Sequence, residues 1–389
     1  MLDVNRREQS GVISVATHAT DPQEAASDLH NALHHADVGA VLFFCSPDYD
    51  LPALAREIET VFPDIPVAGC TTSGELTPDG YAQGCVTAIG FNRHQYAVST
   101  GLIQRLDQFD LLQAQSLIDR LLTDCRSQAV APIRGNTFAM TLLDGLSALE
   151  EQVLVSINSV LGSIPNFGGS AGDNEHLSNT HVYYRGQFYT DAAVLVLINT
   201  RCPFEVFSTV HMKPKQDKLV VTRADDQQRI VYELNAEPAA IAYARAVGVA
   251  TEDLDSAAFA LNPIAVRIGD EYYVRSIQQV DMSDYSLRFY CAVEQGIVLT
   301  TMEAQNMQDD LERRIARINR RIGRTQLIIG CDCFLRRLEA EKLGFQDAMS
   351  ETLRRHHVIG FNTYGEQIGG MYINQTFTGV VIGVDRHAD

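Results

Sequence analysis

The stretch Ile359-Gly360-Phe361-Asn362-Thr363-Tyr364-Gly365-Glu366 predicts a buried strand that ends in a tight glycine-rich turn. A short polar hairpin follows, and residues 378–383 then form a second apolar strand. Glycine is typical of places where the backbone turns sharply or approaches another group closely. The acid directly after the turn can accept a hydrogen bond or cap it. The stretch therefore predicts a strand, a closed turn and a returning strand.

The same pattern occurs twice earlier in the chain. VAGCTTSGE at residues 67–75 leads to an apolar strand at 86–90, and FGGSAGD at residues 167–173 leads to one at 194–198. Each copy follows an apolar strand and a helix, at 41–44 and 51–61, 138–142 and 149–161, and 327–330 and 345–355. The period is far longer than a solenoid repeat, which favours duplicated α/β domains. We predict an α/β fold of mixed β-sheets flanked by helices, built from repeated strand–helix–strand–glycine-turn–strand units.

Length and composition narrow the class of protein. The 389 residues are 46% hydrophobic and 21% charged, which is typical of a soluble globular chain with two or three domains. The formal net charge of −18 argues against binding to nucleic acid or to an anionic membrane surface. No signal-peptide core begins the sequence, no apolar run reaches the roughly 20 residues of a membrane span, and eight cysteines are scattered along the chain. These features predict a cytoplasmic protein that is not itself a membrane-spanning receptor, so any signal that it received would have to pass to a separate partner.

The turn sequences GCTTSGE, GGSAGD and GFNTYGE with the following NQTFT resemble those of FIST-domain sensory proteins. The resemblance runs from about residue 12 to about residue 384. It implies two modules, which we place at residues 12–234 (FIST N) and 235–384 (FIST C). The second module of the family begins with an ELNGxPA turn, and this chain has Ala236 where the glycine is expected. The boundary is therefore approximate.

Within the family, the likeness is to nitric-oxide-sensing haemoproteins. This likeness implies a nitric-oxide sensor that binds haem b non-covalently. It also implies that the sensor regulates a separate partner, which is either a histidine kinase or a diguanylate cyclase or phosphodiesterase. The sequence leaves a homodimer open. An axial histidine in an apolar pocket holds such a haem, and among eleven histidines we choose His211, on an apolar strand that Pro214 interrupts. Strand alternation puts Phe207 on the same face, so Phe207 is expected to pack on the porphyrin. His18 is the second candidate ligand.

A second hypothesis needs no haem. The resemblance also implies amino-acid-like ligands, and the glycine-rich turns gather hydroxyl and carboxyl groups that suit a small polar molecule. The candidate ligand-binding residues are Thr71, Thr72, Glu75, Thr363, Tyr364 and Glu366. Each of them could equally well serve only to close its turn.

We predict no catalytic activity. The chain has no Walker A loop, no GxSxG elbow and no HExxH motif. Cys331, in the sequence Cys331-Asp332-Cys333 before a predicted helix, is the one candidate nucleophile, because a helix N-terminus lowers a thiol pKa. Packing in the core is the alternative for this thiol. Residues 302–322 predict one long helix with acids in its first half and arginines in its second, which either covers a sheet or packs on a partner helix.

Overall fold

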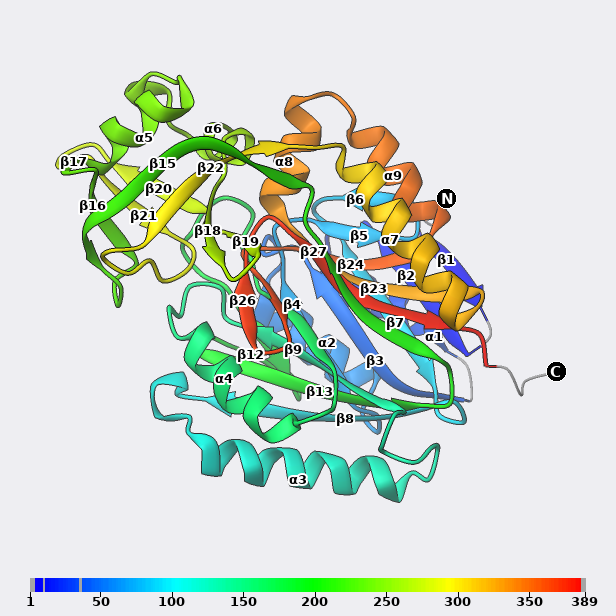
Figure 1. The fold of residues 1–389 in the computed structure, drawn as a ribbon. Helices are drawn as coiled ribbons and strands as arrows, with labels where there is room; N and C mark the ends of the chain where they lie inside the picture. The colour runs from blue at the N-terminus through cyan, green and yellow to red at the C-terminus, as the bar shows by residue number, and fades with distance from the viewer. Residues whose placement is uncertain (1–3, 10, 35–36, 386–389) are drawn as a thin grey trace.

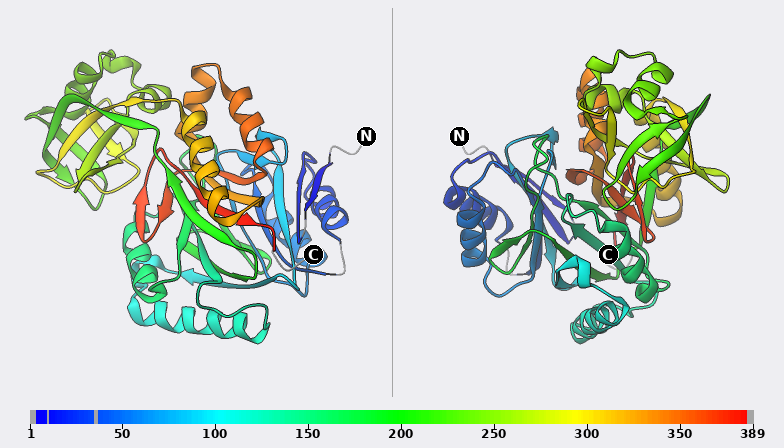
Figure 2. Two further views of the ribbon diagram at one scale, coloured as in Figure 1. Left: turned by 45° about the vertical axis from the view of Figure 1, so that its right-hand side comes forward. Right: turned by 90° about the vertical axis from the view of Figure 1, so that its left-hand side faces the viewer.

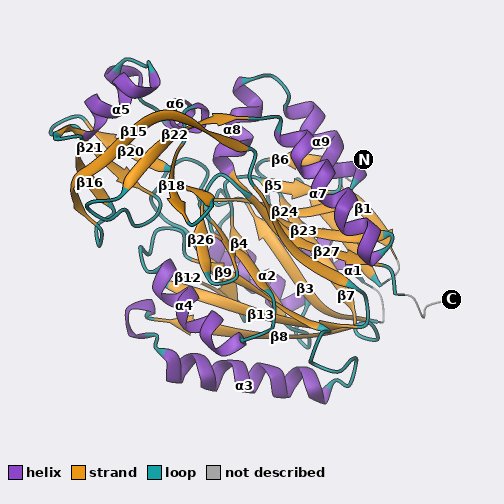
Figure 3. Ribbon diagram, in the orientation of Figure 1, coloured by secondary structure: helices purple, strands orange, loops and turns teal. Residues whose placement is uncertain are grey.

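The computed structural model describes residues 4–9, 11–34 and 37–385. It confirms the predicted mixed α/β class: the described residues form four β-sheets with helices on their outer faces. Helices α3, α7 and α9 lie on the outside of the body and the strands lie between them (Figure 3). None of the helices described is long and apolar enough to cross a membrane.

Three sheets make up the body of the molecule (Figure 1). The strands of the first sheet are, in spatial order, β1 (Val4–Gln9), β2 (Val12–Thr17), β7 (Val86–Asn92), β3 (Val38–Cys45), β4 (Val67–Thr71), β11 (Val182–Tyr184) and β12 (Gln187–Tyr189). Those of the second sheet are β26 (Met371–Ile373), β25 (Glu366–Ile368), β10 (Asn166–Ser170), β9 (Thr137–Leu143), β13 (Ala192–Thr200) and β8 (Tyr96–Gln104). Those of the third sheet are β14 (Phe204–Thr209), β27 (Phe377–Gly383), β23 (Thr325–Cys333), β24 (Val358–Thr363), β5 (Glu75–Thr77) and β6 (Gly80–Ala82).

The three body sheets share one pattern of strand directions. Two antiparallel pairings, or three in the first sheet because β1 adds an edge strand, are followed by one parallel pairing, between β3 and β4, β9 and β10, or β23 and β24. A hairpin from another part of the chain then completes the sheet. Hairpin β5–β6 pairs with β24, β25–β26 pairs with β10, and β11–β12 pairs with β4. Each glycine-rich turn therefore sends its hairpin into the next sheet, and the three sheets hold one another in a closed cycle.

Helices follow the strands of each body sheet. They are α1 (Pro22–Leu33), α2 (Leu51–Val61), α3 (Leu111–Ser127), α4 (Glu150–Leu161), α7 (Met307–Ile322), α8 (Phe334–Lys342) and α9 (Gln346–Arg355), with a 3₁₀ turn η1 (Leu106–Gln108) before α3. Local caps explain where they begin: the Asp21 side chain accepts from Glu24 N at 2.9 Å, and the Asp50 side chain accepts from Ala53 N at 3.0 Å. The helix predicted at residues 51–61 is α2.

The fourth sheet stands apart from the body, and Figure 2 shows it as a separate lobe. Its strands, in spatial order, are β19 (Glu271–Val274), β18 (Ile264–Ile268), β22 (Val298–Ala304), β15 (Met212–Asp225), β16 (Ile230–Leu234), β21 (Ser286–Phe289) and β20 (Ile277–Asp281), with β17 (Glu237–Pro238) beside β16. The lobe also contains α5 (Ala239–Val247), η2 (Thr251–Asp253) and α6 (Ser256–Leu261). It is inserted in the chain between β14 and α7.

Two local predictions were wrong in this lobe. The long helix expected at 302–322 begins only at Met307, because residues 298–304 form strand β22 of the fourth sheet, and the Asn306 side chain caps the helix at Asp309 N. The strand predicted from residue 204 to a break at Pro214 is divided earlier: β14 ends at Thr209, and β15 begins at Met212 and runs through Pro214. Pro214 lies beside a shift of the strand register, where a missing N–H is tolerated.

The main core lies between the body sheets. Apolar side chains from all three contribute to it, and Phe44 of β3 stacks on Phe361 of β24 with ring centroids 4.6 Å apart. Strands on both sides of residue 235 thus share sheets and core, since β14 pairs with β27. The module boundary predicted there stays a prediction.

Candidate ligand-binding site

The three glycine-rich turns meet at the centre of the body and hydrogen-bond to one another. The backbone contacts between them are Ser73 N to Asn362 O (3.0 Å), Tyr364 N to Ser170 O (3.3 Å) and Gly172 N to Thr71 O (3.1 Å). Each turn thereby contacts the other two. The side chains predicted to bind a ligand are brought together, as expected for residues at the ends of equivalent strands.

Glu75 and Glu366 close their own turns in the same way. The Glu75 carboxylate accepts from Thr72 Oγ1 at 2.5 Å and from Cys85 N at 3.3 Å. That of Glu366 accepts from Thr363 Oγ1 and, at 3.0 Å, from Thr376 N. Burial disfavours the charged form and raises the pKa of Glu75 to about 7 and that of Glu366 to about 8. Both carboxyl groups therefore already have hydrogen-bond partners within the protein.

The second turn has Asp173 in place of a glutamate. Its carboxylate accepts from three backbone N–H groups, those of Leu177 (2.9 Å), Ser178 (2.7 Å) and Asn179 (2.8 Å). The Tyr364 hydroxyl of the third turn also donates to it. Asp173 therefore fixes the loop that follows its own turn and ties that loop to the third turn.

All six residues of the turn hypothesis are buried, namely Thr71, Thr72, Glu75, Thr363, Tyr364 and Glu366. Thr71 Oγ1 accepts from His181 N at 3.0 Å, so it too is bonded within the protein. None of the six lines the cavity beside α3 or the cavity beside α7. Ligand binding at the turns stays a prediction.

His211 is buried where the chain leaves the body for the inserted lobe, between β14 and β15. Its Nε2 lies 2.9 Å from Oε2 of Glu339, and its Nδ1 lies 2.7 Å from Nη1 of Arg336. Burial and the neighbouring Arg336 guanidinium lower the pKa of His211. Both ring nitrogens therefore have partners on helix α8.

These surroundings do not fit a haem. An axial ligand needs one free ring nitrogen, and here a carboxylate and a guanidinium occupy both. Phe207 is fully buried and stacks on Phe377 at a centroid distance of 5.9 Å, inside the core beneath α7. His18, the second candidate, is exposed. Haem binding stays a prediction, and it would require His211 to leave its present contacts.

Cys331 is not placed as a reactive thiol. It lies in β23, packed in the main core, and burial raises its pKa well above the usual value. Helix α8 begins later, at Phe334. Within the described residues, no three histidine, cysteine or acidic side chains are grouped so as to hold a metal ion. Cys331 therefore packs in the core, which was the alternative prediction for this thiol.

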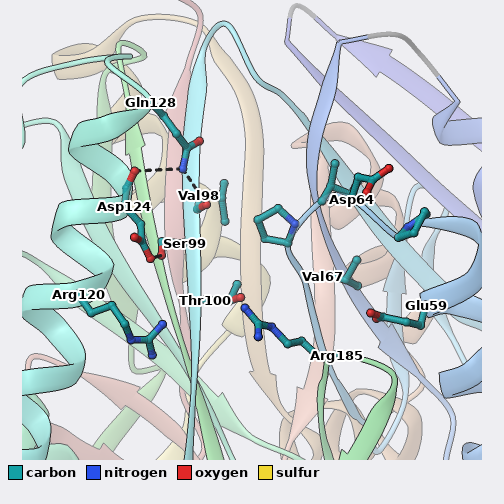
Figure 4. A pocket seen from close by; sticks show the side chains of 13 residues that line it. Glu59, Asp64, Val67, Val98, Ser99, Thr100, Arg120, Asp124, Gln128 and Arg185 are labelled. Atoms are coloured by element: carbon teal, nitrogen blue, oxygen red, sulfur yellow. Dashed lines mark hydrogen bonds between the residues drawn. The ribbon is translucent and has the colours of Figure 1, made fainter.

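An open cavity of about 500 Å³ lies between the first two body sheets. Its walls come from the end of α2 and the loop before β4 on one side, from β8 and α3 on the other, and from the turn of hairpin β11–β12. Figure 4 shows Arg120 of α3 and Arg185 of the hairpin turn reaching toward each other near Thr100 of β8. Two guanidinium groups thus converge over one strand.

Arg120 and Arg185 are exposed, and neither guanidinium group has a carboxylate partner among the described residues. The Arg185 guanidinium lies over the ring of Tyr184, 5.3 Å from its centroid. Carboxylates lie on the opposite walls: Asp124 accepts from Ser99 Oγ at 3.2 Å, and Glu59 accepts from the Tyr183 hydroxyl at 3.2 Å. The cavity therefore offers both positive and negative groups to one occupant.

Sequence reasoning missed this cavity. Its lining comes from residues 59–67, 98–128 and 185, which no motif connects. The single local signal was the Arg185-Gly186 pair, which predicts a hairpin turn and places the arginine at its tip. Both residues have the positive φ of such a turn, 44° and 73°.

Comparison with known protein families identifies both modules. The FIST N domain matches residues 39–237, and the FIST C domain matches residues 239–369. The chain belongs to the FIST family. FIST domains are sensory domains that bind small ligands, and the family is generally without enzyme activity.

Two known proteins show distant similarity to this FIST protein. An uncharacterized protein of Methanocaldococcus jannaschii is 22% identical over 366 residues, covering 82% of this chain and 68% of that protein. Among solved structures, a cyanuric acid hydrolase aligns with 96% of this chain and 99% of its own, at 9% identity and a TM-score of 0.36.

Proposed function

We propose that this FIST protein senses a small amino-acid-like ligand bound in the cavity between its first two body sheets. The observation that carries the proposal is the pair of arginines, Arg120 and Arg185, which converge near Thr100 without a carboxylate partner among the described residues (Figure 4). A guanidinium group binds a carboxylate through two parallel hydrogen bonds. Two such groups at one point suit the carboxylate of an amino acid.

The acidic walls supply the complementary half of the site. Glu59, Asp64 and Asp124 line the same cavity. An ammonium group is a donor without acceptor capacity, so it pairs with carboxylates. An amino acid is a zwitterion and brings one group of each sign to the cavity. Because the cavity has three acidic residues and two arginines, it also suits an amino acid whose side chain carries an additional positive charge.

The position of the cavity suggests how binding becomes a signal. Arg185 lies on the hairpin β11–β12, which comes from the second glycine-rich turn yet completes the first sheet. Arg120 lies on α3, beside the second sheet. A ligand held by both arginines favours arrangements in which the two sheets keep this separation, which is a shift of population toward that state. A histidine kinase or cyclic-di-GMP enzyme as the recipient of the signal stays a hypothesis.

Calorimetric titration with a panel of amino acids tests the proposal. We expect at least one to bind saturably, and Arg120→Gln and Arg185→Gln each to weaken binding about tenfold or more, the equivalent of one lost charge-assisted hydrogen bond. Arg126→Gln is the matched control, because Arg126 is exposed on the same helix and does not line the cavity. If no amino acid binds, or if all three variants bind like the unaltered protein, the proposal is wrong.

A further inference from the structure

A second cavity, of about 230 Å³, lies beside helix α7 at the end of strand β14. The polar residues that line it are Arg313, Arg314, Arg317, Asp310, Ser208 and Thr209. Helix α7 buries Leu311, Ile315 and Ile318 on its other face, next to the third sheet. The helical period of 3.6 residues therefore collects the arginines on the side that faces the cavity.

The charge of this cavity is opposite to that of the whole chain. Three guanidinium groups face one carboxylate, in a protein whose formal net charge is −18. The carboxylate, Asp310, lies 3.9 Å from Arg313, and both side chains are partly or largely exposed, so the pair is weak. The lining therefore carries two positive charges in excess.

Two buried polar groups of the lining lack partners. Thr209 is 4% exposed, and its hydroxyl has no hydrogen-bond partner among the described residues. The same holds for the buried Nε of Arg314. A buried donor without an acceptor costs about 1–3 kcal/mol. The cavity is thus lined by donors that an anionic oxygen would satisfy.

We propose that this cavity binds a phosphate dianion, either free or as a phosphomonoester. The doubly negative charge matches the excess of positive charge in the lining, and arginine forks suit the oxygens of a phosphate. The Thr209 hydroxyl, which lacks a partner among the described residues, supplies a neutral donor. A tetrahedral anion has enough oxygens to meet donors from both the helix and the strand end, whereas one carboxylate has two.

Binding here would reach the connection to the inserted lobe. Val210 also lines the cavity and directly precedes His211, where the chain leaves the body. An anion held between α7 and residues 208–210 would restrain that connection. The inference is independent of the amino-acid site, since the two cavities share no residue.

Titration calorimetry of the full chain with inorganic phosphate, at constant ionic strength set with chloride, tests the proposal. We expect saturable binding, and affinity lower by about tenfold or more in Arg314→Gln and in Arg317→Gln. Arg320→Gln is the matched control: it removes the same charge from an exposed position on the same helix, outside the lining. Its affinity should stay within about twofold of the unaltered protein.

A second probe separates the two sources of phosphate. N-acetyl-phosphoserine amide presents the group as a protein would, and N-acetyl-serine amide is its control. Arginine-dependent binding of inorganic phosphate supports a free anion as the ligand, while arginine-dependent binding of the phosphoserine probe alone supports a phosphorylated side chain. Arg317 is exposed, so Arg317→Gln is expected to fold and keeps the test decisive. The proposal is overturned if neither probe binds, or if Arg320→Gln weakens binding as much as Arg317→Gln.

Discussion

The imidazole Nε2 of His211 lies 2.9 Å from Oε2 of Glu339, and both side chains are buried. The contact fastens the outgoing connection of the inserted lobe to helix α8. The returning connection is fastened to the same residue, because Gln305 N donates to the His211 carbonyl oxygen at 2.6 Å. Arg336, on the other side of the ring, is itself paired with Asp332 at 2.7 Å. The root of the lobe is thus held by a buried polar network.

Removal of the imidazole should destabilise the protein. In His211→Ala, Glu339 and Arg336 stay buried and lose their shared partner, so we expect the free energy of unfolding to fall by about 2–4 kcal/mol. Urea denaturation followed by circular dichroism measures this. His18→Ala, at an exposed histidine, should change the value by no more than about 0.5 kcal/mol. Equal stability of both variants would show that the network contributes little.

The haem hypothesis has a direct spectroscopic test. Because both ring nitrogens of His211 are bonded and Phe207 is packed on Phe377, we expect added hemin to give no Soret band that depends on His211. Ferric, ferrous and nitric-oxide-treated spectra of the unaltered protein and of His211→Ala should therefore match. A Soret band that is lost in His211→Ala would instead mean that the network opens to admit haem, and it would restore the nitric-oxide hypothesis.

The buried carboxyl group of Glu366 should make stability depend on pH. Its folded-state pKa of about 8 lies above the ordinary glutamate value of about 4.5. The protonated Glu366 side chain therefore contributes fully to the free energy of unfolding below about pH 4.5. This contribution is lost as the pH rises through 8, and the free energy of unfolding falls by up to about 1.4 kcal/mol per pH unit. Glu75 has the same sign, with a pKa of about 7. The interval from pH 7 to 8 consequently reports mainly on Glu366.

Glu366→Gln should make the free energy of unfolding nearly independent of pH between 7 and 8. The uncharged amide keeps the shape of the side chain and cannot ionise. Urea denaturation at pH 7.0, 7.5 and 8.0 provides the measurement. Glu271→Gln, at an exposed glutamate, should retain the slope of the unaltered protein. A slope that persists in Glu366→Gln would assign the pH dependence to another group.

Gly360, which lies in the parallel pairing of β23 and β24, should resist substitution by a larger residue. A Cβ at Gly360 would lie 1.8 Å from the Gly330 carbonyl oxygen, which belongs to the backbone of the neighbouring strand. We expect Gly360→Ala to cost about 3 kcal/mol or more, or to prevent folding. Gly90→Ala is the control, since its Cβ would meet only the ends of Leu33 and Val38 at 3.1 Å or more. Similar stability of both variants in urea denaturation would contradict the close approach.

Local sequence determined the elements of this protein. Helix α2 occupies the predicted residues 51–61, and the apolar stretch at 41–44 lies within strand β3. These predictions depend on apolar periodicity and on caps such as Asp50, which act within a few residues. The errors at residues 302–306 and at Pro214 arose where pairing in the fourth sheet overrode the local pattern.

Only the tertiary structure decided where the hairpins and the charged side chains lie. The glycine-rich turns were visible in the sequence, but the pairing of hairpin β5–β6 with β24 joins residues nearly 300 positions apart. The sequence places His211 on an apolar strand, and the histidine becomes a buried hydrogen-bond partner of Glu339 only because α8 packs against it. Arg120 and Arg185 form one site because two sheets meet there. Side-chain period specifies which face of an element is buried, whereas the partner of that face is specified by packing between elements that the local sequence does not encode.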